Sequence, residues 1–361
     1  MMRRRAFLAA MTSAALFSPV RAASSRFDAV VRKTPGKGEF ASITAALAAA
    51  PGDKPFRILV TAGEWRERVN VEKPFVELIG EGRDKTVIVS NASAGDKGEN
   101  GKPIGTFGTP TIYVKAPDFT ARHLTISNDF DYAGHLPKPV PDDKTGASGS
   151  QAVALAIQDK ADRVYLEDVR LTGNQDTLFV NTGRSVFRGC RIEGNVDFIF
   201  GAGRAVFDAC EIVSLLRPNQ DFNGFVVAPD TNVYQPYGFV LVNCKLMKQA
   251  GVAAHTVALG RAWRRTGTFP DGKYGDPEAV GATVYINCWM DDHIVPEGWY
   301  PMGYSKKDGT RTELMPEEAR LFEFGSTGPG ARPASPRRRI LSAEQAKAYD
   351  AKLVLDGWMP Q

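Results

Sequence analysis

Two aspartates, 21 residues apart, have the types and spacing to do chemistry together. Asp176 lies in the segment GNQDTLF (173–179) and Asp197 in GNVDFIFG (194–201). The surrounding sequence repeats at about the same interval, and in a parallel β-helix residues of equal phase stack on strands about 4.8 Å apart. Both carboxylates would then face one groove. Paired carboxylates whose surroundings separate their pKa values are a common acid–base arrangement, so the spacing predicts a hydrolytic enzyme.

Six segments that align on a central residue define the repeat. Each alternates apolar and polar residues and is rich in Val, Ile and Phe, which is strand periodicity. The central residues are Leu124, Val169, Cys190, Cys210, Cys244 and Cys288. The steps between them are 45, 21, 20, 34 and 44 residues. Steps of 20 and 21 residues predict one coil each, the step of 34 predicts one coil with an inserted loop, and the steps of 45 and 44 predict two coils each. We therefore expect an all-β fold, a right-handed parallel β-helix with short capping helices at its ends and long loops lining a groove.

The repeat also predicts a third charged residue beside the aspartates. Asp176, Asp197 and Arg217 each follow a repeat centre by seven residues. Equal phase places Arg217 on the next coil of the same column. The alternative is that this column is a solvated ladder of charges.

The first residues have the pattern of an export signal. Arg3, Arg4 and Arg5 precede an apolar run that ends near Ala22, so we expect a signal peptide at 1–22 and a single domain at 23–361. The arginine pair resembles a twin-arginine signal, with ordinary secretion as the alternative. Without Arg3, Arg4, Arg5 and Arg21, the 45 basic residues become 41, equal to the 41 acidic residues. The charge therefore gives no reason to expect nucleic-acid or membrane binding, and we expect a monomer in the periplasm or outside the cell.

Helix signals stand near both ends of the chain, and loop signals stand between the repeats. Residues 42–50 (SITAALAAA) suit a short helix that covers the first coil, and Ser342 with Gln345 forms a capping box for a helix through Leu353. Covering both ends would protect edge strands from pairing with other chains. The stretches 129–150 and 264–281 are rich in Pro, Gly, Asp and Lys and predict long loops.

Export changes the interpretation of the four cysteines. Cys190 and Cys210 stand one coil apart in equal phase, which predicts Cα atoms about 5 Å apart and a disulfide bond in an oxidising compartment. The alternative is a ladder of buried thiols, which we expect for Cys244 and Cys288. No CxxC or Cys/His cluster indicates a metal site, and no metal or organic cofactor is expected.

Ester hydrolysis needs further groups around the aspartates. Gln151 and Gln175 are neutral amide donors that could stabilise an oxyanion, although such residues are often only solvated. Arg261, in LGRAW (259–263), is a candidate partner that would keep Asp197 ionised, while Asp176 beside that charge would stay protonated. Trp263 could stack on a sugar ring or belong to the core. A GxSxG motif is absent from the sequence, which weakens the case for a serine hydrolase.

GNQDTLF, GNVDFIFG, LGRAW and the glutamine of SQAVAL together resemble the pectin methylesterases, most closely the bacterial ones. The resemblance covers nearly the whole mature chain and includes GTFGTPTIYV (105–114) and MDDHI (290–294). It implies that Asp197 is the nucleophile, Asp176 the general acid and then base, Gln151 and Gln175 the oxyanion donors, and Arg261 the residue that orients Asp197. It also implies substrate contacts at Thr106, Val196, Phe200, Arg217, Trp263 and Met290. The family usually has proline where this chain has Ala262.

The implied substrate is the methyl-esterified galacturonan of pectin, which would be hydrolysed to galacturonate and methanol. Two other interpretations share the fold. A lyase or glycosidase would cleave the polymer chain, and a lyase would usually need an acidic calcium site. A secreted binding module would depend on aromatic stacking and would need neither aspartate.

Overall fold

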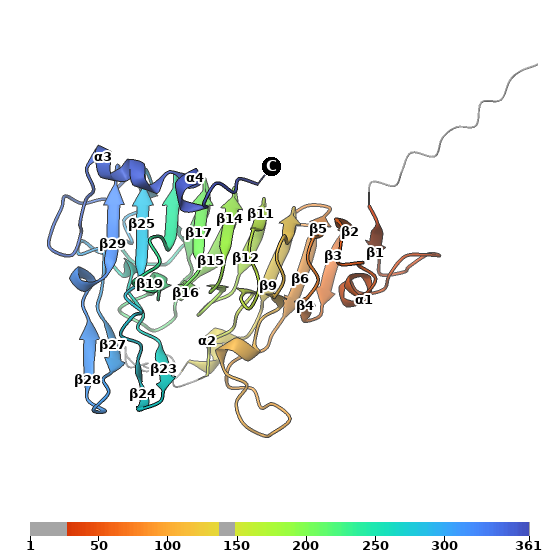
Figure 1. The fold of residues 1–361 in the computed structure, drawn as a ribbon, viewed down its shortest axis with the longest axis horizontal. Helices are drawn as coiled ribbons and strands as arrows, with labels where there is room; N and C mark the ends of the chain where they lie inside the picture. The colour runs from red at the N-terminus through yellow and green to blue at the C-terminus, as the bar shows by residue number, and fades with distance from the viewer. Residues whose placement is uncertain (1–26, 137–148, 361) are drawn as a thin grey trace, which may run out of the picture.

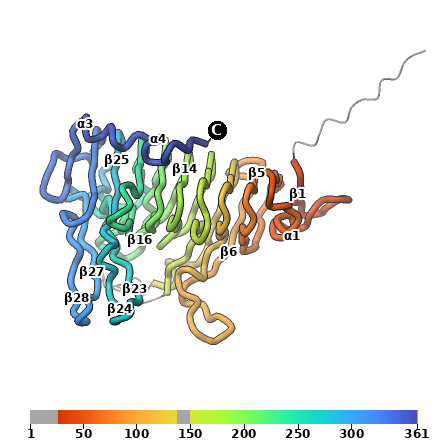
Figure 2. The backbone as a smooth tube through the Cα atoms, in the orientation of Figure 1, coloured from red at the N-terminus to blue at the C-terminus, as the bar shows by residue number. Residues whose placement is uncertain are grey.

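Three parallel sheets wind around one apolar core in the computed structural model, which describes residues 27–136 and 149–360. The predicted signal peptide, residues 1–22, lies outside the described residues. Within the described part, each complete coil of the chain contributes one strand to each sheet, so the molecule is a parallel β-helix (Figures 1 and 2). This confirms the predicted fold class.

The sheets differ in length, and the pocket described below lies on the third. Sheet A consists of β1 (Ala29–Val31), β2 (Phe56–Val60), β5 (Val76–Gly80), β8 (Thr120–Arg122), β11 (Val164–Glu167), β14 (Arg184–Arg188), β17 (Arg204–Asp208), β20 (Phe239–Val242), β25 (Ala282–Ile286) and β29 (Arg320–Phe324). Sheet B consists of β3 (Gly63–Arg66), β6 (Thr86–Ser90), β9 (Thr125–Asn128), β12 (Arg170–Thr172), β15 (Arg191–Gly194), β18 (Glu211–Ser214), β21 (Lys245–Lys248) and β26 (Trp289–Met290). Sheet C consists of β4 (Val69–Val71), β7 (Ile112–Val114), β10 (Leu155–Ile157), β13 (Leu178–Val180), β16 (Val196–Gly201), β19 (Gly224–Pro229) and β22 (Val257–Gly260).

Every step between repeat centres is a single coil. Strand β8 pairs directly with β11, with Thr120 opposite Tyr165, and β20 pairs with β25, with Val242 opposite Ile286. The prediction that the steps of 45 and 44 residues each span two coils is therefore wrong. The additional residues leave the coil between β9 and β10 and between β22 and β25, where the sequence predicts long loops.

The turn from sheet A to sheet B is built the same way in successive coils. Before the buried residues Cys190, Cys210, Cys244 and Cys288, the chain passes through Gly189, Ala209, Asn243 and Asn287, all with φ between 50° and 57°. A residue in this left-handed region turns the chain sharply, and the residue after it then points into the core. We call these four left-handed residues the turn column.

The predicted disulfide between Cys190 and Cys210 is wrong. All four cysteines are free and buried. The Cys190 thiol donates to the carbonyl of Leu166 at 3.5 Å, and the Cys210 thiol donates to that of Phe187 at 3.3 Å. Parallel strands of equal phase keep stacked Cβ atoms about 4.8 Å apart, whereas a disulfide requires about 3.8 Å. The cysteines therefore form the buried ladder that was the alternative.

The N-terminal helix covers the first coil as predicted, but the C-terminal helices lie elsewhere. Helix α1 (Ile43–Ala48) begins after Ser42, whose hydroxyl accepts from the Ala45 amide, and packs against β1 and β4. The predicted capping box of Ser342 and Gln345 is present. The predicted helix is divided into α3 (Ala343–Ala346), the 3-10 turn η4 (Lys347–Tyr349) and α4 (Ala351–Val354).

These C-terminal segments follow the outer face of sheet A because that face is apolar. Val354 and Leu355 pack there with Val186 and Val206. The segment therefore does not cover the last coil as predicted. None of the helices in residues 27–136 and 149–360 is long and apolar enough to cross a membrane.

Two hairpins and three short helical turns complete the described part. The hairpins are β23 (Thr266–Phe269) with β24 (Gly272–Gly275) and β27 (Met302–Ser305) with β28 (Arg311–Leu314). The helical turns are η1 (Thr106–Gly108), α2 (Tyr132–His135) and η3 (Pro316–Glu318). Both hairpins project from the same side of the solenoid (Figure 1).

Candidate active site

Both candidate catalytic aspartates adopt left-handed backbone conformations at the start of sheet C strands. The φ angle is 64° at Asp176 and 49° at Asp197. Directly after Asp197, the consecutive residues Phe198 and Ile199 both belong to the core, so the strand alternation is interrupted there. In a regular strand, residues two positions apart face the same side. Here each aspartate faces the pocket while the residue two positions later, Leu178 or Ile199, points into the core.

Asp197 forms a two-pronged ion pair with Arg261, which follows β22. Arg261 Nε lies 3.0 Å from Oδ1 and Nη2 lies 2.8 Å from Oδ2. The flat face of the guanidinium covers the Phe225 ring, at 3.8 Å from the ring centroid. The ring supports the guanidinium on its face while two N–H groups at its edge hold the carboxylate, so Arg261 fixes the orientation of Asp197 and stabilises its negative charge.

Asp176 is the carboxyl of the pair whose surroundings favour the protonated form. Burial raises the pKa of this carboxyl well above its ordinary value, and the negative charge of Asp197 raises it further, while Arg261 acts in the opposite direction. A carboxyl that favours its proton therefore lies beside a carboxylate that is paired with an arginine. Such an arrangement can supply an acid and a nucleophile or base in one site.

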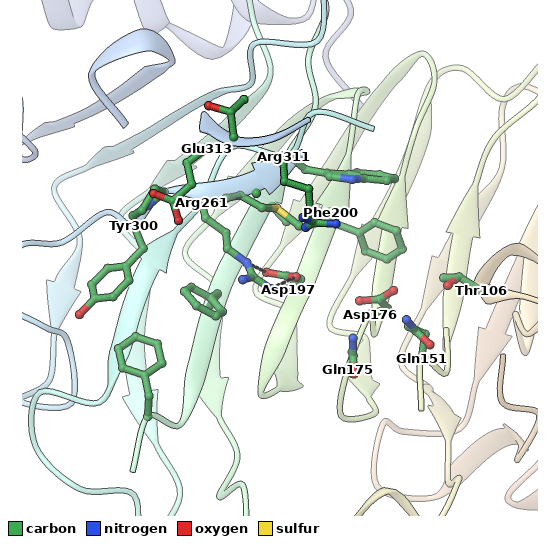
Figure 3. Close-up of a pocket in the computed structure, with 18 of the residues that line it drawn as sticks. Thr106, Gln151, Gln175, Asp176, Asp197, Phe200, Arg261, Tyr300, Arg311 and Glu313 are labelled. Atoms are coloured by element: carbon green, nitrogen blue, oxygen red, sulfur yellow. Dashed lines mark hydrogen bonds and ion pairs between the residues drawn. The ribbon is translucent and has the colours of Figure 1, made fainter. Parts of the chain in front are cut away.

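Two glutamines stand next to Asp176, and the β-helix brings them there from adjacent coils. Gln151 precedes β10 and Gln175 precedes β13, and the Ala152 amide donates to the Gln175 carbonyl at 3.1 Å. Figure 3 shows both side-chain amides directed to the side of Asp176 that faces the pocket. Amide N–H groups in this position can donate to an oxygen that gains negative charge.

These side chains line a cavity of about 910 Å³. Its floor is formed by sheet C, and residues from loops and a hairpin form its walls (Figure 3). Phe200 stacks on Phe179 at 4.6 Å between centroids and lies 6.2 Å from Trp263. Polar side chains and aromatic rings therefore line the same cavity.

The structure places only half of the six predicted substrate contacts on the pocket wall. Thr106, Phe200 and Trp263 line it. Val196 is 1% exposed and packs beneath Phe225. Met290 is fully buried in the core, 3.6 Å from the Arg338 guanidinium, because its side chain points inward from β26. Neither Val196 nor Met290 is placed to touch a substrate, so these two predictions are corrected.

Arg217 also lies behind the pocket wall. It is 3% exposed, and its backbone amide donates to Asn223 at 2.8 Å. Its guanidinium lies close to the Tyr132 phenol, whose pKa is raised by burial and lowered by Arg217. Arg217 lies near the two aspartates, because Arg217, Asp176 and Asp197 all act on the pKa of Tyr132. Arg217 does not line the pocket, so the structure does not place it to contact a substrate there.

Sequence reasoning missed one wall of the pocket altogether. Strands β27 and β28 contribute Met302, Gly303, Arg311, Thr312 and Glu313. The helical turn η1 contributes Phe107, and loops contribute Phe222 and Tyr300. The hairpin lies more than 100 residues after the aspartates, outside every repeat. Alternating residues around a turn at Lys306–Thr310 could have indicated the hairpin, but not its place beside the pocket.

Fold and pocket together define a class of protein: a parallel β-helix enzyme whose site contains an ionised carboxylate, a protonated carboxyl and amide donors. Among residues 27–136 and 149–360, no group of three His, Cys, Asp or Glu side chains is arranged to hold a metal ion. The comparisons with known proteins narrow this class.

The sequence profile of the Pectinesterase family matches residues 28–351. Pectinesterase A of Dickeya dadantii (strain 3937) is 41% identical over 344 residues, which cover 94% of this chain and 93% of that protein. A crystal structure of a pectin methylesterase in complex with a hexasaccharide has a TM-score of 0.88 at 41% identity, covering 94% of this chain and 99% of that one. The pectin methylesterase from Yersinia enterocolitica has a TM-score of 0.84 at 44% identity, covering 88% and 99%. The chain therefore belongs to the pectinesterase family and is a carboxylic ester hydrolase.

Proposed function

We propose that this protein hydrolyses the C6 methyl esters of homogalacturonan, the main chain of pectin, to free galacturonate and methanol. The observation that supports it most directly is the ion pair of Asp197 with Arg261 beside the protonated Asp176. The relatives are pectin methylesterases, one of them in complex with a hexasaccharide. The aromatic rim of the pocket suits the flat faces of sugar rings.

In the first half of the reaction, ionised Asp197 attacks the ester carbonyl carbon. The carbonyl oxygen becomes an oxyanion that receives hydrogen bonds from the amides of Gln151 and Gln175. As the tetrahedral intermediate collapses, the bond to the methoxy oxygen breaks and Asp176 gives its proton to that oxygen. Methanol leaves, and galacturonate and Asp197 are joined as an anhydride.

In the second half, Asp176 is an ionised base. It takes a proton from water, whose oxygen attacks the galacturonyl carbon of the anhydride. The bond to Asp197 breaks, which restores the Asp197 carboxylate, and Asp176 is protonated again. The new galacturonic acid then ionises in solution. The alternative route uses Asp197 as a general base on water, without an anhydride.

Labelled water distinguishes the two routes. In the covalent route, attack of water on the Asp197 carbonyl carbon in some turnovers transfers labelled oxygen to Asp197, and mass spectrometry of its peptide detects it. In the general-base route the water oxygen enters only the product. Single-turnover trapping at low pH provides a second measurement, because it preserves an anhydride if one forms.

The function itself is tested by methanol release from highly methylated pectin, with a parallel assay for new chain ends. We expect methanol from the parent, none from Asp197→Asn, and no chain cleavage by either. Chain cleavage without methanol would instead indicate a lyase or glycosidase. Binding of pectin with neither product would indicate a binding module.

We also propose that residues 1–22 direct export, that the mature protein is one domain, and that it acts as a monomer in the periplasm or outside the cell. The substrate supports this proposal, because a cell-wall polymer does not enter the cytoplasm. The N-terminal sequence of the secreted protein tests the cleavage site, and sedimentation of the mature protein tests the monomer.

A further inference from the structure

Asp230 is a buried carboxyl that takes no part in the proposed reaction. It directly follows β19, and its side chain is completely buried. Neither carboxyl oxygen accepts a hydrogen bond from another residue in 27–136 or 149–360. Arg265 Nη1 lies 3.4 Å from Asp230 Oδ2, which makes the two an ion pair. Because a buried carboxylate is costly unless a cation stands beside it, Arg265 is the residue that permits Asp230 to ionise.

Arg265 also spans the strand that carries Asp197. Asn181 directly follows β13 and Asp230 directly follows β19, and these two strands lie on either side of β16 in sheet C. Arg265 Nη1 donates to Asn181 Oδ1 at 3.5 Å, so the guanidinium contacts both flanking coils. Since a guanidinium presents several donors in a fixed plane, one side chain can tie the ends of the two strands together.

The segment that carries Arg265 also carries Trp263 into the pocket. Trp263 lines the cavity, and its ring lies 6.2 Å from that of Phe200. The Trp263 backbone amide donates at 2.8 Å to the carbonyl of Pro229, the residue before Asp230. Trp263 and the ion pair are therefore adjacent both along the chain and across the coils.

The other arginine of this segment is held elsewhere. Arg264 donates to the Ala279 carbonyl at 3.2 Å and covers the Tyr304 ring at 4.7 Å. It thereby joins the segment to the loop after β24 and to the β27–β28 hairpin. Arg265 joins the same segment to sheet C. The position of Trp263 relative to the floor of the pocket therefore depends on Arg265.

The strength of the Asp230–Arg265 pair depends on pH. Burial raises the pKa of the Asp230 carboxyl to about 7, while Arg265 lowers it and Asp276 raises it. Asp276 directly follows β24, and its Oδ2 atom lies 4.0 Å from Arg265 Nε. Protonation of Asp230 removes the closer of these two carboxylate charges from Arg265, and ionisation restores it.

Resting on the esterase function proposed above, we propose that Asp230 is a positioning residue, which holds Trp263 in the pocket wall through Arg265. The ionised pair fixes the segment, whereas protonation of Asp230 releases Arg265 and lets Trp263 move. Asp230 itself does not line the pocket. Because a displaced ring weakens the binding of substrate and transition state alike, the effect falls on KM and leaves kcat unchanged.

The first test replaces the carboxyl by a neutral group of the same shape. Asp230→Asn imitates the protonated carboxyl and never ionises. KM for methanol release from highly methylated pectin is measured at about pH 5.5 and about pH 8, on either side of the pKa of Asp230. We expect KM of the variant to equal that of the parent at the lower pH and to exceed it about threefold at the higher pH. At each pH, kcat should be the same in both proteins.

Two further variants test the route through Arg265 and Trp263. Arg265→Gln should raise KM with the same dependence on pH, and adding Asp230→Asn to it should raise KM no further. In a Trp263→Ala background, Asp230→Asn should leave KM unaltered at both pH values, because no ring remains to be positioned.

The matched control is Asp208→Asn on the outer face of sheet A, which removes a carboxylate 3.5 Å from Arg188. Its KM should equal that of the parent at both pH values. Thermal unfolding shows whether each variant folds. If Asp230→Asn does not fold, the pH profile of Arg265→Gln decides the question, because the Arg265 side chain is 40% exposed and Asp230 can stay protonated without it.

The possible failures differ from one another. Equal KM values for Asp230→Asn and the parent at both pH values overturn the role of Asp230 and leave the esterase function in place. A rise in KM that is the same at both pH values also overturns it, because charge would then not explain the result. An effect of Asp230→Asn that persists in the Trp263→Ala background overturns the route through Trp263. Absence of methanol from the parent overturns the proposed function and this inference together.

Discussion

The turn column and the two aspartates proposed to be catalytic share one backbone conformation, but it directs their side chains to opposite places. At Gly189, Ala209, Asn243 and Asn287 a positive φ recurs in successive coils and directs the next residue into the core. At Asp176 and Asp197 the same conformation, in two adjacent coils of sheet C, directs a carboxylate out into the pocket. The left-handed residue that shapes the turns of this repeated fold can thus also form a site, where its side chain is polar and faces a groove.

The comparison also shows where strain is stored. In the turn column, glycine or asparagine occupies three of the four positions and tolerates the left-handed region. At the aspartates the proposed reaction requires a carboxyl side chain, so surrounding contacts must hold the left-handed conformation. Substitutions at both sets of positions test this difference.

Asp197→Asn should lower kcat/KM for methanol release by roughly 10³-fold or more, because it removes the nucleophile of the proposed reaction. Asparagine keeps the side-chain shape, so the fold should be retained. Ala209→Asn, the matched change in the turn column, should leave kcat/KM unaltered. The assay is methanol release at saturating and limiting pectin. A comparable loss in both variants would contradict the separation of roles.

Gly194→Ala should lower the free energy of unfolding by about 3 kcal/mol. A Cβ atom there would lie 2.2 Å from Phe198 Cβ and 2.7 Å from the Asn174 carbonyl oxygen, so the coil that carries Asp197 would have to move. Gly189→Ala is the control from the turn column. With φ at 57° and nothing within 4 Å of its Cβ, it should cost about 1 kcal/mol, the backbone term alone.

Urea unfolding of both variants checks these values. Equal losses would mean that the catalytic coil is no more tightly packed than the turn column.

Asp176→Asn should make stability less dependent on pH. The raised pKa of Asp176 means that the folded protein keeps a proton that the unfolded chain releases near pH 3.9. The parent therefore loses stability as pH rises from about 4 through the raised pKa, by about 1.4 kcal/mol for each pKa unit of the shift. The variant lacks this loss.

Unfolding in urea at about pH 4 and about pH 8 measures the effect. The stability of the variant relative to the parent should be greater at the higher pH. A constant difference would mean that Asp176 ionises at its ordinary pKa. Asp208→Asn, on the exposed face of sheet A, is a control for the loss of a surface carboxylate.

Ala209→Gly should raise the free energy of unfolding by about 0.5–1 kcal/mol, because glycine adopts a φ of 53° without the steric cost of a Cβ atom. Thermal or urea unfolding measures this gain. A lower free energy of unfolding in the variant would mean that the left-handed conformation costs alanine little at position 209.

Reducing agent should leave stability unchanged, which is the smallest effect in this series. The four cysteines are free thiols, so no cross-link exists to be lost. Titration of the denatured mature protein without reductant should count four thiols. Two thiols would show that Cys190 and Cys210 are joined after all.

The regular part of the fold was predictable from sequence because its strands recur at a nearly constant spacing along the chain. Alternating segments around Cys190 and Cys210 indicated stacked strands, and the spacing of Asp176 and Asp197 placed them on adjacent coils. The steps of 44 and 45 residues were misjudged, because a coil tolerates a long loop without losing register. Length alone does not separate two coils from one coil with an insertion.

Equal phase also failed as a guide to bonding and contact. Cys190 and Cys210 stack as predicted, but both are free thiols. Met290 was assigned to the substrate through a short motif, yet its strand turns the side chain into the core. A motif specifies which residue is present, and the direction of the side chain depends on the strand that carries it.

The sequence by itself determined the repeat, the two aspartates on neighbouring coils and the residues available for chemistry, because these depend on local periodicity and residue type. Only the tertiary structure decided which distant segments complete the site. The sequence suggested Arg261 as the partner of Asp197, and the structure shows that pair across 64 residues. The β27–β28 hairpin adds Arg311 and Glu313 to the same pocket, which no motif in the sequence suggested. Those contacts depend on how loops of unequal length fold back over the solenoid, and no period in the sequence specifies that path.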